Sequence, residues 1–319
     1  MNCIKKGIKI LTNDFRKWRA FGFKIFYYSF MRDLIFRKQN RYGKYFEKKK
    51  YNQVCIYLKK KYSKYLSVFK IENKDFLQNN IESSVPIWIM WWQGEKQQPL
   101  IVKECIKSIK KHNGQHKVII IDKMNISEFI NFPSYILEKV EKGIISLTEL
   151  SDITRIGLLK EYGGIWIDST IFVNDDIDKE LLDYPFFTVK HNLMGDYHIC
   201  HGKWSSFFLA TNKENPYFDF CLNFFYEYWK NENLLIAYLL IDAIMYIGYE
   251  KEIYFKELID MVPINNTKTF EFNRILNHKY NFDFYLEISE NTYIYKLSYK
   301  QIINYDDNEN YWNNVVCDQ

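Results

Sequence analysis

Apolar runs alternate with segments of helical periodicity from residue 81 onward. Residues 85–92 form a nearly continuous apolar run that ends shortly before a glycine, which predicts a buried strand. Residues 99–113 place apolar side chains at helical spacing between a proline and an Asn-Gly pair, as expected for a helix. Residues 117–122 form a second apolar run. Strand, helix and strand in this order predict the opening of a parallel α/β sheet.

The same criteria extend the prediction along the rest of the chain. They predict helices over residues 134–142, 215–230 and 234–249 and strands over residues 184–190 and 202–211. No repeat or low-complexity linker interrupts residues 81–319, so we interpret this part as one domain.

The segment SDITRIGLLKEYGGIWIDST, residues 151–170, joins a helix to a strand through two glycines. We expect Thr148 or Ser151 to cap the helix and Gly163 to end it, because glycine readily adopts the left-handed backbone of a helix terminus. The apolar run after Gly164 predicts a strand that is buried on both faces. The two glycines therefore turn the chain tightly between the helix and the strand.

This segment also carries the charged residues with the clearest chemical potential. Asp152 and Arg155 are three residues apart, so they project from one face of the helix. Asp168 emerges at the carboxyl end of the strand, the edge where open α/β sheets bind ligands. An aspartate there suits a divalent cation that bridges a diphosphate, and Thr170 adds a hydroxyl group. Two simpler interpretations stay open: a surface ion pair for Asp152 and Arg155, and a turn beginning at Asp168.

Charge divides the chain into two unequal parts. Residues 1–80 hold 21 Lys/Arg and 5 Asp/Glu, whereas residues 81–319 hold 23 and 34. The chain is therefore a basic helical extension, residues 1–80, joined to an acidic domain, residues 81–319.

Aromatic and basic residues are mixed in the extension. Helical spacing relates Trp18, Phe21, Ile25 and Tyr28. The basic residues around them are Arg16, Lys17, Arg19, Lys24, Arg32, Arg37 and Lys38. Two compatible interpretations follow: a helix on an anionic membrane surface, or a helical cap docked on the domain. The longest nearly apolar piece, residues 20–31, is too short to span a bilayer. No signal-peptide cleavage site follows it, and we find no nucleic-acid-binding module.

The six cysteines form no CxxC pair, which is typical of reduced thiols in a cytosolic protein. His198, Cys200 and His201 lie close together, but no second pair of ligands is near them in the sequence, so we do not predict a metal site there.

The segment at residues 151–170 resembles the capsular polysaccharide synthesis protein family. These proteins look related to glycosyltransferase family 32 and, more distantly, to the glucosylating domains of large clostridial toxins. The shared pattern is Ser-Asp-x-x-Arg, an apolar helix, Tyr-Gly-Gly, and an apolar strand that ends in the Asp-x-Asp region. The resemblance extends to IWIMWWQGEKQQP, GKWSSFFLATNKENP and YKLSYK, and it covers most of residues 81–319.

The resemblance implies a GT-A-like fold with a mixed central sheet, and a glycosyltransferase, expected to be a hexosyltransferase. It implies transfer of a sugar from a nucleotide-sugar donor to a capsular or other cell-surface polysaccharide, with retention of configuration and with Mn²⁺ or Mg²⁺. Asp152 and Arg155 would contact the donor sugar, and Asp168 would be both the metal-linked and the catalytic residue. Thr170 stands where many relatives have a second acid, and a single carboxylate binds such a metal loosely without donor phosphates.

Other candidate residues lie outside this segment or at its turn. The donor-binding set also includes Trp91, Trp92, Gln93, Gly163, Gly164, Lys296 and Lys300. One of the two tryptophans is alternatively a core residue. The two lysines would neutralise the diphosphate, unless they belong to a basic surface strand. Asp242, inside an apolar helix, would lie near the transferred sugar, unless it makes an ordinary core hydrogen bond.

Two functions therefore compete. The first is a metal-assisted glycosyltransferase, a cytoplasmic protein bound peripherally to the inner face of the plasma membrane. Its acceptor would be a glycan, and a glycan attached to a lipid fits this location. The second is a non-catalytic GT-A-like binding or scaffold subunit of a polysaccharide assembly complex. Thr170 favours the scaffold, whereas the retained Asp152, Arg155 and Asp168 favour the enzyme.

Overall fold

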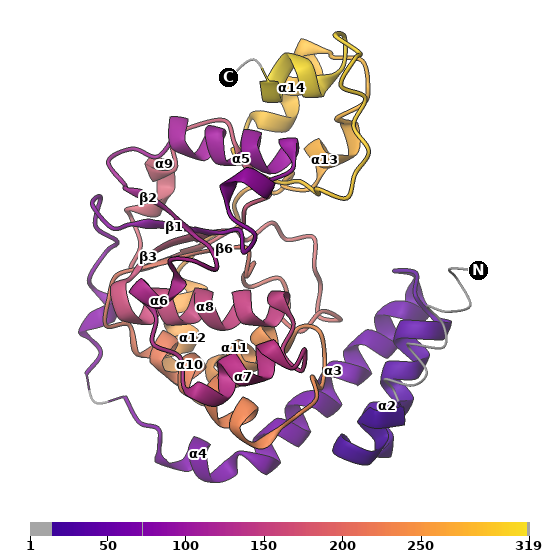
Figure 1. The fold of residues 1–319 in the computed structure, drawn as a ribbon, viewed down its shortest axis with the longest axis vertical. Helices are drawn as coiled ribbons and strands as arrows, with labels where there is room; N and C mark the ends of the chain where they lie inside the picture. The colour runs from indigo at the N-terminus through magenta and orange to yellow at the C-terminus, as the bar shows by residue number, and fades with distance from the viewer. Residues whose placement is uncertain (1–14, 72, 318–319) are drawn as a thin grey trace.

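A five-stranded mixed sheet forms the centre of the protein (Figure 1). The computed structural model describes residues 15–71 and 73–317. The strands lie in the order β2-β1-β3-β6-β5. Their bounds are β1 (Ile87–Met90), β2 (Val118–Ile121), β3 (Gly164–Ile167), β5 (Phe186–Thr188) and β6 (Phe208–Thr211). Strand β1 runs parallel to β2 and β3, and β6 runs antiparallel to β3 and β5. The expected α/β fold with a mixed sheet is confirmed.

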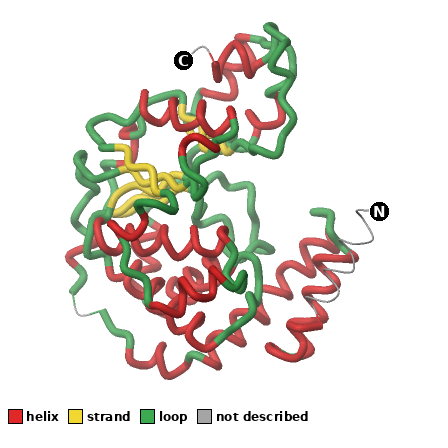
Figure 2. The backbone as a smooth tube through the Cα atoms, viewed as in Figure 1, coloured by secondary structure: helices red, strands yellow, loops and turns green. Residues whose placement is uncertain are grey.

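Helices cover both faces of this sheet, with α5 and α9 on one side and α8, α10, α11 and α12 on the other (Figures 1 and 2). Their bounds are α5 (Leu100–Lys111), α6 (Ile126–Phe129), α7 (Ser134–Glu141), α8 (Leu147–Tyr162), α9 (Asp178–Leu181), α10 (Pro216–Asn231), α11 (Leu240–Lys251) and α12 (Ile253–Asp260). Every residue of β1, β3 and β6 is buried. Continuous apolar runs are the expected composition of such strands, because neither face meets water.

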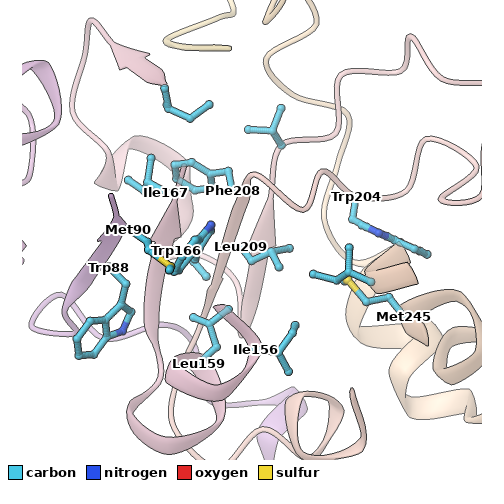
Figure 3. Packing of buried hydrophobic residues seen from close by; sticks show 14 of the residues in the cluster. Trp88, Met90, Ile156, Leu159, Trp166, Ile167, Trp204, Phe208, Leu209 and Met245 are labelled. Atoms are coloured by element: carbon cyan, nitrogen blue, oxygen red, sulfur yellow. The ribbon is translucent and has the colours of Figure 1, made fainter. Parts of the chain in front are cut away.

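Apolar side chains form much of the contact between α8 and the sheet. Ile156 and Leu159 of α8 point toward Trp166 and Leu209 of the sheet, and all four side chains are buried (Figure 3). This packing fixes the rotation of α8, and so it decides which of its residues face the strand ends.

A second, two-stranded sheet brings the C-terminal part of the chain back to the domain. Strand β4 (Ile171–Val173) pairs antiparallel with β7 (Ile294–Lys296), and Ile171 lies opposite Lys296. The helices α13 (Glu271–Ile275) and α14 (Phe282–Ser289) lie beside this sheet, at the end of the molecule opposite α2 and α3 (Figure 1). Because β4 begins three residues after Asp168, the β4–β7 pairing places Lys296 next to the predicted site.

The N-terminal segment packs on the domain through an apolar stripe. It contains α2 (Phe23–Phe30), α3 (Arg41–Lys61) and α4 (Ser63–Val68). Tyr51, Val54 and Leu58, three or four residues apart on α3, are buried. The Tyr57 hydroxyl donates to Glu232 at 3.0 Å, and the Tyr65 hydroxyl donates to the carbonyl of Phe220 at 2.8 Å. Within the described residues, no helix is both long enough and apolar enough to cross a bilayer.

Two predicted helix starts are wrong. Helix α8 is capped by Ser146, not by Thr148 or Ser151, because Ser146 and Glu149 satisfy each other's backbone N–H groups in a capping box. The helix predicted over residues 234–249 begins only at Leu240. Before Leu240, backbone N–H groups form tertiary hydrogen bonds instead of helical ones. The N–H of Ile236 donates to the Tyr228 hydroxyl, and the N–H of Leu239 donates to the Tyr51 hydroxyl.

Candidate active site

The lengths of α8 and β3 bring Arg155 and Asp168 to the same level. From Arg155 to Gly163, α8 runs eight residues in one direction, which is about 12 Å at 1.5 Å per residue. Strand β3 then returns four residues to Asp168, about 13 Å at 3.3 Å per residue. The two side chains therefore meet, with Arg155 Nη2 3.0 Å from Asp168 Oδ1.

Asp152 joins this pair from the preceding turn of α8. Its Oδ1 lies 3.3 Å from Arg155 Nη1, as the spacing of three residues predicts. Both residues are buried, so the interpretation as a surface ion pair is wrong. The Arg155 guanidinium also lies 5.0 Å from the ring centre of Trp166, a cation–π contact. Its Nε atom finds no hydrogen-bond partner among the residues that the structure describes.

Asp168 is the centre of the cluster, because its carboxylate has partners on both oxygens. Oδ1 accepts hydrogen bonds from Arg155 and, at 2.9 Å, from Trp166 Nε1. Oδ2 lies 2.6 Å from Lys296 Nζ. Burial by itself would raise the pKa of Asp168, but the charges of Lys296 and Arg155 outweigh that effect, and the pKa is lowered. Asp168 is therefore ionised at neutral pH.

Lys296 is the cation that the second sheet contributes. Its Nζ lies 3.0 Å from the Thr170 hydroxyl as well as 2.6 Å from Asp168. The backbone holds the same arrangement, because the N–H of Leu297 donates to the carbonyl of Thr170 at 2.9 Å. The structure therefore joins Lys296 and Thr170 to the cluster of Asp152, Arg155 and Asp168.

The Arg155 charge also opposes the effect of burial on the pKa of two acids, Asp152 and Asp242. Burial raises the pKa of Asp152 to about 7, against the opposing effect of Arg155 and with a smaller contribution from Asp242. Burial also raises the pKa of Asp242, which is opposed by His198, Trp204 and Arg155. Trp204 Nε1 donates to Asp242 at 2.8 Å, so the core hydrogen bond of the simpler interpretation is present. The catalytic role of Asp242 stays a prediction.

Three of the predicted donor-binding residues, Trp91, Trp92 and Gln93, follow the carboxyl end of β1. Trp91 and Trp92 are half-buried against the core, and Gln93 is exposed. The Trp91 ring meets Tyr299 edge-on, with 5.7 Å between ring centres. Lys300 Nζ lies 5.7 Å from the Tyr299 ring centre, and within the described residues no ion pair joins it to Asp168. Trp91 and Lys300 thus both lie near Tyr299, and among the described residues no interaction joins either of them to Asp168.

The structure places Gly163 and Gly164 away from the cluster. They stand at the amino end of β3, with φ angles of 66° and 109°. An added Cβ would collide with backbone atoms of Lys213 at Gly163 and of Pro86 at Gly164. Trp88 Nε1 also donates to the Gly163 carbonyl at 2.9 Å. Both glycines serve the tight turn, and we correct their expected place beside the donor.

Residues 34–315 match the model of a family described as capsular polysaccharide synthesis protein. The chain belongs to the capsular polysaccharide synthesis protein family. The match begins inside the N-terminal extension, so the part shared with this family includes α3 and α4. One solved structure, titled "PaToxG Glycosyltransferase", aligns with a TM-score of 0.39 and 16% identity over 66% of this chain and 80% of that chain. A likeness this weak carries no weight for fold or function. No curated protein matches.

Sequence reasoning missed two residues of this capsular polysaccharide synthesis protein. Trp166 precedes Asp168 by two positions in an extended segment, so both side chains point to one face, and this spacing was a usable signal. Tyr238 is the second: it lines a cavity beside the N-terminal segment, and partial burial, followed by the charges of Asp152 and Glu149, raises its pKa. No local pattern marks Tyr238.

The side chains around Asp168, as arranged, do not fit a divalent cation. Magnesium and manganese prefer about six ligands, mostly oxygen atoms. Both Asp168 oxygens face N–H donors of Arg155, Trp166 and Lys296 instead. Within the described residues, no group of three or more His, Cys, Asp or Glu side chains is placed to hold a metal ion. A metal at Asp168 and Thr170 stays a prediction from the resemblance.

Proposed function

We propose that this capsular polysaccharide synthesis protein is a GT-A-type glycosyltransferase, with a nucleotide sugar as donor and a growing capsular or other cell-surface polysaccharide as acceptor. The observation that carries the proposal is the cluster of Asp152, Arg155, Asp168 and Lys296, in which Asp152 and Arg155 are buried and the other two are partly exposed. It lies where β3 ends, at the sheet edge where α/β proteins bind ligands. Buried charged groups such as Asp152 and Arg155 are costly to maintain for stability alone.

The reaction needs a stabilised leaving group. The bond from the anomeric carbon to the diphosphate breaks, the acceptor oxygen takes its place, and the acceptor's proton leaves with the diphosphate. Lys296 stabilises the charge that develops on the departing diphosphate. Asp152 and the remaining Arg155 donors contact the hydroxyl groups of the donor sugar. Asp242 faces the anomeric carbon, in keeping with retention and with transfer of a hexose.

The acceptor enters through a cavity of about 1170 Å³ between the N-terminal segment and the domain. Its lining includes Arg16, Tyr51, Lys142 and Tyr238. The cavity also borders Ser146, the residue that caps α8, and α8 is the helix that carries Asp152 and Arg155. Basic side chains at its wall suit an acceptor with a phosphate group, as a lipid-linked glycan has.

We also propose that the N-terminal segment contacts the membrane. The side chains available for this contact differ from the predicted set of Trp18, Phe21, Ile25 and Tyr28. Phe21 and Ile25 are buried, so they do not insert into lipid. The exposed aromatic residues there are Phe15, Trp18, Phe23 and Tyr27. The exposed basic residues beside them are Arg16, Arg19 and Lys24. This mixture of aromatic and basic groups suits an anionic bilayer surface at the cytoplasmic face.

A thermal-shift panel of nucleotide sugars tests the proposal, because a ligand that binds the native state raises the unfolding temperature. The sugar that binds is then used in hydrolysis and transfer assays. We expect Asp168→Asn to abolish turnover, since asparagine does not balance the charges of Lys296 and Arg155. Asp183→Asn, at an exposed position, is the matched control. Absence of binding to every nucleotide sugar, with and without Mn²⁺, would favour the scaffold function instead.

A further inference from the structure

We propose that Lys296 supplies the positive charge at the donor diphosphate, and that donor binding and transfer by this protein need no divalent metal. The inference rests on the proposed glycosyltransferase function. It departs from what the resemblance implies, because the structure places an ammonium group where a metal ion was expected.

The first reason is position. A metal held by Asp168 and Thr170 would lie between their side-chain oxygens. Lys296 Nζ occupies that place, 2.6 Å from Asp168 Oδ2 and 3.0 Å from Thr170 Oγ1. An ammonium group has three N–H donors. Two of them serve these oxygens, and no third partner for Nζ is found among the described residues, so one donor remains for a phosphate oxygen.

The second reason is how firmly Lys296 is held. Its backbone N–H donates to the carbonyl of Thr269 at 2.8 Å, and the residue pairs with Ile171 in the β4–β7 ladder. Its ammonium lies 5.4 Å from the ring centre of Phe207. The side chain is only 24% exposed, which leaves one open side. The ammonium is therefore positioned before any donor binds, and such preorganised charge is the most effective kind.

The third reason is the charge balance of the cluster. Arg155 and Lys296 carry two positive charges, whereas Asp168 carries one negative charge. Asp152 adds a second negative charge only in part near neutral pH, because burial raises its pKa to about 7. A site that attracts a divalent cation has an excess of acids before the ion binds. This cluster has the opposite excess, which attracts a diphosphate directly.

Movement of Lys296 would not create a good metal site. It would leave one carboxylate, Asp168, and one hydroxyl, Thr170, and the described residues contain no group of three potential acidic, His or Cys ligands. A divalent cation would then be held almost entirely by donor phosphates and water. The charge that the diphosphate needs is therefore best supplied by Lys296 itself.

The experiment uses the full-length protein freed of metal with a chelator. Calorimetry measures binding of uridine and guanosine diphosphate with excess chelator and again with Mn²⁺, and turnover of the nucleotide sugar found by thermal shift is measured under the same two conditions. We expect binding and turnover to be equal in both. Lys296→Met should weaken diphosphate binding by about 10- to 100-fold, the loss typical of one charge-assisted hydrogen bond. Lys296→Arg should retain most of it.

Two further variants guard the interpretation. Lys279→Met, at an exposed ion pair with Glu309, should bind the diphosphate as the wild type does. Lys296→Asp places a second carboxylate beside Asp168, so its diphosphate binding should become dependent on Mn²⁺, a gain that misfolding cannot imitate. Wild-type binding and turnover that require Mn²⁺ would overturn the inference and leave the proposed transferase intact. No nucleotide binding in either condition would overturn both.

Discussion

Replacing Asp152 by asparagine should make the protein more stable at mildly alkaline pH while it impairs donor use. Asp152 is a buried acid, with 12% of its side chain exposed, and burial raises its pKa from 3.8 to about 7. Between these two values the unfolded chain has lost the proton and the native protein still holds it. Stability therefore falls as the pH rises through this range. Asparagine cannot ionise, so the variant lacks this loss.

The size of the effect follows from the two pKa values. The full difference of about 3 pK units corresponds to roughly 4 kcal/mol of stability lost above pH 7. Of this, about 2 to 3 kcal/mol is lost between pH 5 and pH 8. The rest is lost below pH 5, and the loss stops near pH 7, where Asp152 also ionises in the native protein. The free energy of unfolding of Asp152→Asn relative to wild type should rise by that amount over the same interval. Groups that titrate alike in both proteins cancel from the comparison.

Urea unfolding followed by tryptophan fluorescence, in steps of pH between 5 and 8, measures this gap. The exposed Asp183→Asn variant is the control, and its curve should run parallel to that of the wild type. A gap for Asp152→Asn that stays constant from pH 5 to pH 8 would refute the reasoning, since it would mean that Asp152 ionises in the native protein as it does in the unfolded chain. Donor binding, measured in parallel, should be weaker in Asp152→Asn at every pH.

Three other perturbations have clear expected results. Arg155→Ala should lower the free energy of unfolding by about 3 kcal/mol, because it leaves the buried Asp152 without its cation and leaves Asp168 with Lys296 as its remaining cation. Chemical unfolding measures this change, and donor binding should fall more than nucleoside diphosphate binding. Gly164→Ala should lower the free energy of unfolding by at least about 2 kcal/mol, because φ is 109° and the added Cβ would collide with the Pro86 carbonyl. The protein that still folds should bind the donor normally, and unchanged stability would contradict the turn assignment. Trp18→Ser should reduce salt-sensitive sedimentation with anionic liposomes, whereas Phe282→Ser, at an exposed position of α14, should not. Equal sedimentation would exclude the aromatic contact.

Local pattern was enough for the parts of the site that lie close together in the chain. The apolar run that became β3 predicted a strand buried on both faces, and Gly163 marked the end of α8. The spacing of Asp152 and Arg155 predicted their contact on one helix face. These features depend on backbone periodicity and on the steric freedom of glycine, which a short stretch of sequence contains.

Only the tertiary structure decided which distant groups join them. Lys296 reaches Asp168 across 128 residues, through the β4–β7 pairing, and this contact adds a positive charge beside the Asp168 carboxylate. The late start of α11 at Leu240 depends on hydroxyl groups of other segments, and the burial of Phe21 and Ile25 depends on how the N-terminal helices pack. Such outcomes follow from the competition between long-range contacts and the entropy of closing long loops, which no local periodicity records.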